Sequence, residues 1–274
     1  MKGNVYANRH RKPLCVVKRD FLSTPAPGYD ARLDPRQPAA PTPDVTHTMH
    51  PDAQWFPQAG FGLFMHWGIH STAGLQPSWA MVKDYPYGGD SPYNAPEKYW
   101  ALAPQFNPQH YAPDRWLAAA ARAGFTYAVL TTKHHDGYAL WPSRHGDFGV
   151  RQYLGGRDLT GPYVEACRRH GLRVGFYFSP RDWRYPGYPA DYTGHDYRKG
   201  QNNALPFADP VRNQAEFDKF YAFTRSQIEE LLTWYGRIDI LWFDGLSWPG
   251  AEIPTTEIFT WVRSLQPGIV INNR

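Results

Sequence analysis

A carboxylate at the end of an apolar run is the first residue of this chain that could do chemistry. The segment 238–243 is largely apolar, and Asp244 and Gly245 follow it. Alternate side chains of a β-strand share one face, so Ile240, Trp242 and Asp244 would point the same way. Parallel α/β folds place their chemistry at the carboxyl ends of strands. Asp244 is therefore either a catalytic carboxylate or the first residue of a turn with Gly245.

Histidines follow two earlier apolar segments, again directly at the segment's end. His66 follows the first of them, and His134 and His135 follow the second. Clustered imidazoles can bind zinc, and with Asp244 they would form the site of a metal-dependent hydrolase, although the HxH and HExxH spacings do not occur. Imidazoles can equally donate hydrogen bonds to sugar hydroxyls, with Asp244 as the nucleophile of a retaining glycosidase. A non-catalytic sugar-binding module is the third possibility.

Five strand-like apolar segments alternate with helix-like segments along the chain. The predicted strands cover 60–68, 127–132, 173–179, 238–243 and 269–274, and the predicted helices cover 113–123, 160–170, 213–235 and 257–265. This alternation predicts a parallel α/β fold. Polar clusters follow one strand after another and no Gly-rich phosphate loop follows the first, which favours a (β/α)8 TIM-type barrel over a doubly wound sheet. Because such a barrel has eight strands, we expect it to be truncated here after about five strands.

The overall composition argues against several classes of protein. The 274 residues include 29 basic and 25 acidic ones, a formal charge of +4 without a long block of one sign, so no nucleic-acid partner is expected. No run of 18 apolar residues occurs, so no membrane insertion is expected, and no signal peptide is visible. Aromatic residues reach 16%, which suits the apolar faces of sugar rings. Two cysteines make no disulfide framework, and Cys167 is expected to be a reduced core thiol.

Proline sets the N-terminal part of the chain apart. Residues 1–51 begin basic and become proline-rich from Pro25 onward. Proline prevents helix continuation and removes donors from a strand ladder. We expect residues 1–51 to be a flexible N-terminal extension and residues 52–274 to be a partial (β/α)8 glycosidase catalytic domain. Nothing in the sequence indicates the oligomeric state.

Five motifs, in order along the chain, resemble the α-L-fucosidases of glycoside hydrolase family twenty-nine. They are Phe61–Gly68, Thr131–Tyr138, Gly175–Ser179, Leu241–Gly245 and Val270–Arg274, of which the Lys-His-His-Asp-Gly stretch is the most specific. The resemblance covers roughly residues 52–274. It implies a retaining hydrolase with a (β/α)8-like catalytic domain and a C-terminal β-sandwich, which releases α-L-fucose from a fucosylated oligosaccharide or glycoconjugate without a metal or an organic cofactor. The resemblance alone points to an extracytoplasmic location.

The resemblance also implies roles for individual residues. Asp244 would be the nucleophile. The substrate-binding residues would be His66, Trp79, His134, His135, Tyr177 and Arg274. Among these, the three histidines would hold sugar hydroxyls, Trp79 and Tyr177 would line the pocket, and Arg274 would lie near the nucleophile.

The chain departs from the family pattern in three places. Relatives commonly carry a sugar-binding Glu immediately before the Trp79 equivalent, where this chain has Ser78, so recognition of the fucose hydroxyls is expected to differ. Asn273 stands where an Asp is usual. The family's general acid/base lies beyond the equivalent of Arg274, so we expect it to be missing from this chain. Glu257 fits the first turn of a helix, where a carboxylate is favoured, and is interpreted as structural.

Overall fold

The computed structural model describes residues 48–82, 92–93, 96–186, 210–246 and 253–272. Residues Thr42–Arg274 form one compact unit. The extension expected over 1–51 falls almost entirely outside the described residues, so that extension and the domain of 52–274 stay predictions. No described helix is both long enough and apolar enough to cross a membrane.

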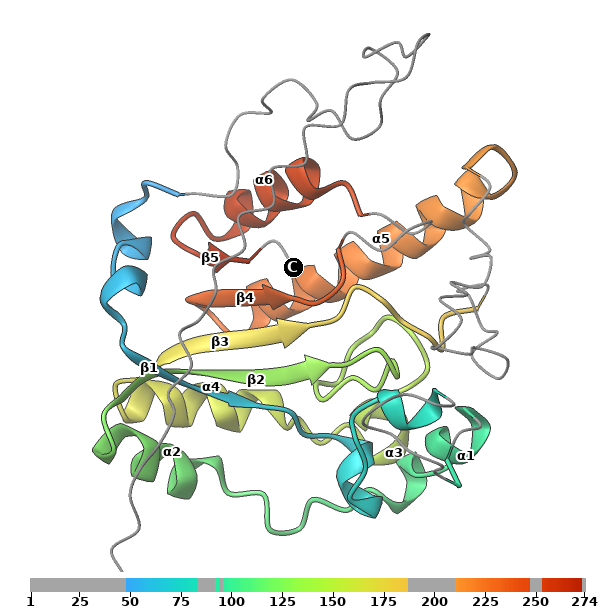
Figure 1. The fold of residues 1–274 in the computed structure, drawn as a ribbon, viewed down its shortest axis with the longest axis horizontal. Helices are drawn as coiled ribbons and strands as arrows, with labels where there is room; N and C mark the ends of the chain where they lie inside the picture. Colours follow the sequence, from blue (N-terminus) through green and yellow to red (C-terminus); the bar gives the residue numbers. More distant parts are fainter. Residues whose placement is uncertain (1–47, 83–91, 94–95, 187–209, 247–252, 273–274) are drawn as a thin grey trace, which may run out of the picture. The chain divides into compact units, whose positions relative to one another are not determined.

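The core of the fold is one parallel sheet whose strands follow each other in chain order (Figure 1). The strands are β1 (Phe61–Met65), β2 (Phe125–Lys133), β3 (Arg173–Phe178), β4 (Ile240–Phe243) and β5 (Val270–Ile271). The register places Leu130 between Met65 and Phe176, and Phe176 next to Leu241. The five strands and their parallel arrangement confirm the α/β prediction. The order of the described strands contains no reversal, so they form no switch point of the doubly wound kind.

Longer helices connect the strands where the sequence predicted them. They are α2 (Pro113–Arg122), α4 (Thr160–Arg169), α5 (Pro210–Trp234) and α6 (Thr255–Leu265). The boundaries of α2 show the physical reason: Pro113 and Asp114 occupy its first turn, and Gly124 takes a φ of 89° just beyond its end. The sequence did not predict the shorter helices of the described residues, which are α1 (Pro96–Trp100), α3 (Val150–Tyr153) and the 3-10 helices Pro51–Ala53, Phe56–Gln58, Ile69–Ala73, Trp79–Met81 and Ala103–Gln105.

The four longer helices all pack on the same face of the sheet. Their shared core includes strand residues Leu130, Phe176 and Leu241 and helix residues Leu117, Val164, Leu231 and Phe259. The opposite face carries a separate small cluster of Val129, Tyr177 and Ile240, with Trp242 beside it. None of the described side chains of the four helices contributes to this second cluster. Because Asp244 continues the alternation of Ile240 and Trp242, this second face leads directly to the carboxylate.

Strand β4 begins later than the sequence predicted, and a side chain explains why. Oδ2 of Asp239 accepts a hydrogen bond from the backbone N–H of Val174 (2.9 Å), and Oδ1 pairs with Arg173 (3.1 Å). The carboxylate thus takes a donor that a regular ladder would use, and β4 starts at Ile240. Cys167 lies in α4 as a buried free thiol, which confirms that prediction.

Candidate active site

Five of the predicted site residues lie at the carboxyl ends of four neighbouring strands. His66 follows β1, His134 and His135 follow β2, Tyr177 lies near the end of β3 and Asp244 follows β4. The Tyr177 ring centroid is 4.9 Å from that of His66 and 5.3 Å from that of His134. Parallel strands bring these distant segments together because their carboxyl ends share one edge of the sheet.

Asp244 is held by contacts to its carboxylate and remains partly open to solvent. The Tyr177 hydroxyl donates a hydrogen bond of 2.8 Å to Oδ2, and Nε2 of His135 lies 3.7 Å from the same oxygen. The Asp244 side chain is 21% exposed. Burial and the negative charge of Asp244 raise the pKa of Tyr177 well above its ordinary value of 10.0. Tyr177 therefore stays a phenol that donates to the carboxylate.

Two of the histidines are oriented in the same way by a neighbouring hydroxyl. Nδ1 of His135 lies 2.5 Å from Oγ of Ser179, and Nδ1 of His66 lies 2.6 Å from Oγ1 of Thr131. Each hydroxyl donates its own proton to a backbone carbonyl, at 2.8 Å for Ser179 and 2.9 Å for Thr131. The hydroxyl oxygens therefore accept Nδ1–H from the rings, and the Nε2 edges face the other way.

His134 differs from the other two in its burial and its partner. Its ring stacks on Tyr177 with an interplanar angle of 7° and meets His66 edge-on at 5.3 Å. Its Nδ1 lies 2.6 Å from Oγ of Ser78. Burial lowers the pKa of His134 well below its ordinary value of 6.5, and the neighbouring His135 and His66 lower it further. His134 is therefore a neutral ring at physiological pH.

Two indoles form an aromatic wall beside His135. Trp79 begins a 3-10 helix, and its ring lies 5.4 Å from His135 and 5.3 Å from Trp183, edge-on in both cases. The backbone N–H of Trp183 donates to the carbonyl of His135 at 2.7 Å. The sequence reasoning missed Trp183, although its position shortly after β3 follows the same strand-end rule that found Asp244.

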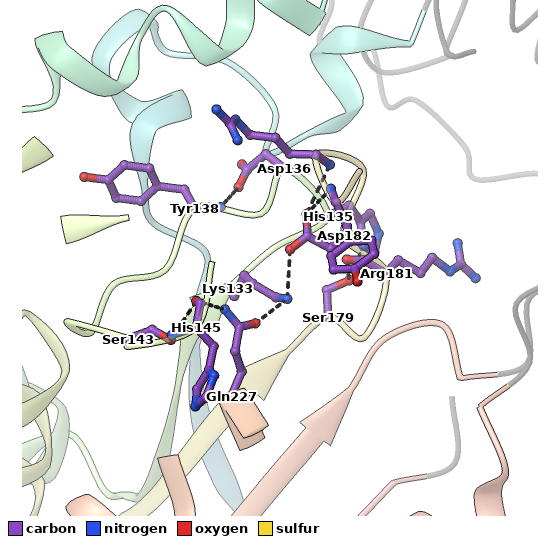
Figure 2. A network of polar contacts seen from close by, with 12 residues as sticks. Lys133, His135, Asp136, Tyr138, Ser143, His145, Ser179, Arg181, Asp182 and Gln227 are labelled. Carbon is purple, nitrogen blue, oxygen red and sulfur yellow. Dashed lines mark hydrogen bonds and ion pairs between the residues drawn. The ribbon is translucent and has the colours of Figure 1, made fainter. Parts of the chain in front are cut away.

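A buried ion pair, also missed by the sequence reasoning, joins the end of β2 to the loop after β3 (Figure 2). Lys133 is fully buried, and its Nζ donates to Oδ2 of Asp182 at 3.2 Å and to Oε1 of Gln227 at 2.7 Å. It also lies over the Phe178 ring, 4.6 Å from the centroid. Burial lowers the pKa of Lys133, and the charge of Asp182 opposes that shift. Because Trp183 follows Asp182, the pair ties the histidine loop to the aromatic wall.

Other described carboxylates near the motifs are already engaged. Asp136 accepts from the Tyr99 hydroxyl and from the backbone N–H of Tyr138, both at 2.9 Å, and burial raises its pKa to about 6. Glu257 lies in α6 and pairs with Arg225 at 3.2 Å, which agrees with its structural interpretation. Arg274 and Asn273 lie outside the described residues, so the place expected for Arg274 beside the nucleophile stays a prediction.

Three of the site residues could also hold a metal ion. His134, His135 and Asp244 each offer a ligand atom, and these atoms all lie within 4.8 Å of one another. A set of two imidazoles and a carboxylate is a familiar zinc site. The Nδ1 atoms of both histidines already contact hydroxyl oxygens, so only their Nε2 atoms could serve as ligands without breaking those contacts.

A cavity of about 770 Å³ lies beside β1, away from the carboxylate. Its lining includes Leu63, Met65 and Leu130, which belong to the helix-covered face of the sheet, together with Tyr111. Of the predicted site residues that the structure describes, only His66 contributes to it. The chemistry at Asp244 and this apolar cavity are thus separate features of the described structure.

A parallel sheet whose carboxyl edge carries a partly exposed carboxylate among imidazoles, a phenol and indoles is an arrangement typical of α/β glycosidases. The comparisons with known proteins give the family. The chain belongs to the alpha-L-fucosidase family, whose model matches residues 34–274.

Solved structures and curated relatives agree with this assignment. Alpha-L-fucosidase isoenzyme 1 from Paenibacillus thiaminolyticus is 35% identical with a TM-score of 0.63, over 82% of this chain and 50% of that one. A covalent intermediate of a Bacteroides thetaiotaomicron alpha-L-fucosidase, trapped with 2-fluoro-fucosyl fluoride, is 28% identical with a TM-score of 0.64, over 82% of this chain and 48% of that one. Tissue alpha-L-fucosidase of Mus musculus is 29% identical over 82% of this chain and 48% of its own length. The chain thus spans about half the length of the curated relatives that it matches most extensively.

Proposed function

We propose that this chain carries the nucleophile of a retaining glycoside hydrolase that releases α-L-fucose from fucosylated glycans, with Asp244 as that nucleophile. The observation that carries the proposal is the setting of the Asp244 carboxylate. It stands at the carboxyl end of β4, accepts a 2.8 Å hydrogen bond from Tyr177 and keeps 21% of its side chain exposed. A nucleophile needs this combination of fixed orientation and access to the reacting carbon.

The reaction follows from that setting. A carboxylate oxygen of Asp244 attacks the anomeric carbon, and the bond to the leaving oxygen breaks as that oxygen takes a proton from a second carboxylic acid. The resulting glycosyl ester is then hydrolysed by a water that the second carboxylate deprotonates. The solved relative trapped as a covalent intermediate with 2-fluoro-fucosyl fluoride supports this two-step course.

The substrate-binding residues surround the same point. We propose that His66, His134 and His135 bind the sugar hydroxyls and that Tyr177 and Trp79 line the pocket. Their ring contacts with one another support a shared wall: His66 lies 4.9 Å from Tyr177, and Trp79 lies 5.4 Å from His135. Arg274 is proposed to lie beside the nucleophile on the strength of the family motif alone.

The proton donor for the leaving group is proposed to lie outside residues 1–274. Among the described carboxylates near the site motifs, Asp136 is bound by Tyr99 and Asp182 by Lys133, which leaves neither in the role of a proton donor to a leaving group. We further propose that the five strands belong to a (β/α)8 barrel, of which 1–274 covers the first part. The packing of all four longer helices on one face of the sheet supports a barrel, because a doubly wound sheet has helices on both faces.

The experiment is covalent labelling of the 274-residue chain with 2-fluoro-fucosyl fluoride. Fluoride leaves without a proton donor, so labelling tests the nucleophile separately from the acid. Mass spectrometry should find one fluorofucosyl adduct on the peptide that contains Asp244. Asp244→Ala should take up no label, whereas Glu257→Gln, whose exposed carboxylate pairs with Arg225, should be labelled like the wild type. A folded chain that binds L-fucose but carries its label elsewhere, or carries none, contradicts the proposal.

The metal-dependent alternative is favoured by one observation, the three ligand atoms within 4.8 Å at His134, His135 and Asp244. The same experiment separates it from the glycosidase reading. Labelling that persists after exhaustive chelation, in protein without stoichiometric zinc by elemental analysis, supports a metal-free site. One bound zinc per chain, with labelling lost on its removal, supports the metal site. A chain that binds fucose without any labelling would be a sugar-binding module.

A further inference from the structure

Ser78 has a strained backbone conformation. Its φ of 56° and ψ of −43° make it the one described residue other than glycine with a positive φ. The N–H of Trp79 donates to the carbonyl of Pro77 across it at 2.5 Å, so Ser78 is the centre of a γ-turn of the rare positive-φ form. Strain of this kind persists only where the surroundings fix it. The contacts of Ser78 must therefore account for its conformation.

The Ser78 hydroxyl is buried between two partners with different capabilities. The backbone N–H of Asp136 donates to Oγ at 2.8 Å, and Nδ1 of His134 lies 2.6 Å from the same oxygen. A backbone N–H can only donate, so Nδ1 of His134 is the one acceptor in this pair for the serine proton. The surrounding protons are also assigned, because the Ser78 N–H donates to Oη of Tyr99, and Tyr99 donates to the Asp136 carboxylate.

This assignment fixes the tautomer of His134. A proton on Nδ1 would direct two donors at Oγ and leave the serine proton without an acceptor at a fully buried position, which is unfavourable. With Nδ1 as the acceptor, the single proton of the neutral imidazole lies on Nε2. Nε2 of His134 has no hydrogen-bond partner within the described part of the chain and is not sealed from solvent. It can therefore donate to a bound molecule.

We propose that Ser78 is a positioning residue that determines which hydrogen bonds His134 makes with the substrate, by holding it in the Nε2–H tautomer. His134 then presents a donor to a sugar hydroxyl from Nε2. At His66 the neighbouring hydroxyl has the opposite effect, because Thr131 donates its proton to a backbone carbonyl and so accepts a proton from Nδ1. A carboxylate at position 78 could only accept, so it would draw the His134 proton to Nδ1 and reverse the polarity of that ring. The sugar contact rests on the proposed function, and the tautomer does not.

The tautomer can be observed directly in the full chain. Two-bond ¹H–¹⁵N correlation spectra of the ¹⁵N-labelled protein distinguish protonated from unprotonated ring nitrogens, and His134→Gln identifies the His134 signals by their loss. Above the titration range of histidine, we expect His134 to show a protonated Nε2 and an unprotonated Nδ1. A wild-type spectrum with the proton on Nδ1 overturns the proposal, whatever the variants do.

Two substitutions test the role of the hydroxyl. Ser78→Gly removes it and relieves the positive φ, and Ser78→Ala removes it without that relief. In both variants we expect the pure Nε2–H pattern to be lost and an Nδ1–H form to appear. Thr131→Val, the matched change at the His66 pair, should leave the His134 signals unchanged. A folded Ser78→Gly variant with the wild-type His134 pattern shows that the serine does not set the tautomer.

L-Fucose separates this inference from the proposed function. Titrating L-fucose into the labelled wild type should shift the Nε2 signal of His134, and Ser78→Gly should weaken binding about tenfold, as expected for one hydrogen bond between neutral groups. An Nε2–H tautomer that depends on Ser78 but does not respond to fucose refutes the sugar contact and the proposed substrate while leaving the tautomer assignment in place. A fucose response unaffected by Ser78→Gly refutes the specificity role.

Discussion

Breaking the buried ion pair beside the histidines should destabilise the fold strongly, and breaking it from both sides should cost less than from either alone. Lys133→Met keeps an unbranched apolar chain against Phe178 and removes the charge. Asp182→Asn keeps the acceptor oxygen that caps the backbone N–H groups of Arg184 and Tyr185, both at 3.1 Å, and removes the opposite charge. Each single change therefore leaves the other charge buried and unpaired.

The structure sets the magnitude. The Lys133 and Asp182 side chains are 0% and 5% exposed, so water screens the pair little. Removing one partner of such a pair costs roughly 3–5 kcal/mol, whereas replacing both is often neutral. For a folded region of this size that corresponds to a loss of roughly 10 °C in Tm for each single variant. The double variant should lose less than either single one, because it leaves no buried charge.

Urea denaturation gives the coupling energy between Lys133 and Asp182 directly. It requires four proteins, which are the wild type, the two single variants and the double variant. The pH dependence adds a check on the cause. Without Asp182, burial depresses the pKa of Lys133 further in the folded state. Between that lowered pKa and the ordinary value of 10.5, the unfolded chain binds more protons than the folded one. The stability of Asp182→Asn should therefore rise as the pH increases towards 10.5. Lys219→Met, in an exposed pair with Glu216, should show no measurable loss. Single variants as stable as this control, or strictly additive losses, would refute the reasoning.

Three further outcomes are expected. Gly137→Ala should be much less stable in urea than Gly155→Ala, because both positions have a positive φ but only at Gly137 would the new Cβ lie 2.5 Å from a carboxylate oxygen; equal losses would contradict this. Burial raises the pKa of Asp136 from 3.8 to about 6, so between these pH values the folded state binds one proton more than the unfolded state. The free energy of unfolding should therefore fall as the pH rises from about 4 to 6, and Asp136→Asn should remove this pH dependence. Tyr177→Phe should slow fluorofucosyl labelling of Asp244 roughly 10–100-fold, the worth of a hydrogen bond to a charged group, with little change in Tm; an unchanged rate would remove the phenol from the mechanism.

Much of the site was predictable because its main residues obey one local rule. His66, His134, His135 and Asp244 each follow an apolar segment, and strands that alternate with helices must be parallel, so their ends had to meet at one edge. The face of the sheet on which Asp244 lies was also predictable from a local pattern. The period of two along 240–244 predicts Asp244 on the face of Ile240 and Trp242, and these two residues do share a cluster.

The sequence by itself therefore determined the parallel sheet and the groups at its carboxyl edge, because those depend on periodicity within short segments and on the alternation of strands with helices. Only the tertiary structure decided how these groups are held. Ser78 contacts His134 from a γ-turn, Lys133 at the end of β2 pairs with Asp182 in the loop after β3, and Trp183 joins the wall beside His135. Such contacts join segments with no regular spacing between them. The fold brings each donor to its acceptor and each charge to its partner. No local pattern of residues predicts these pairings.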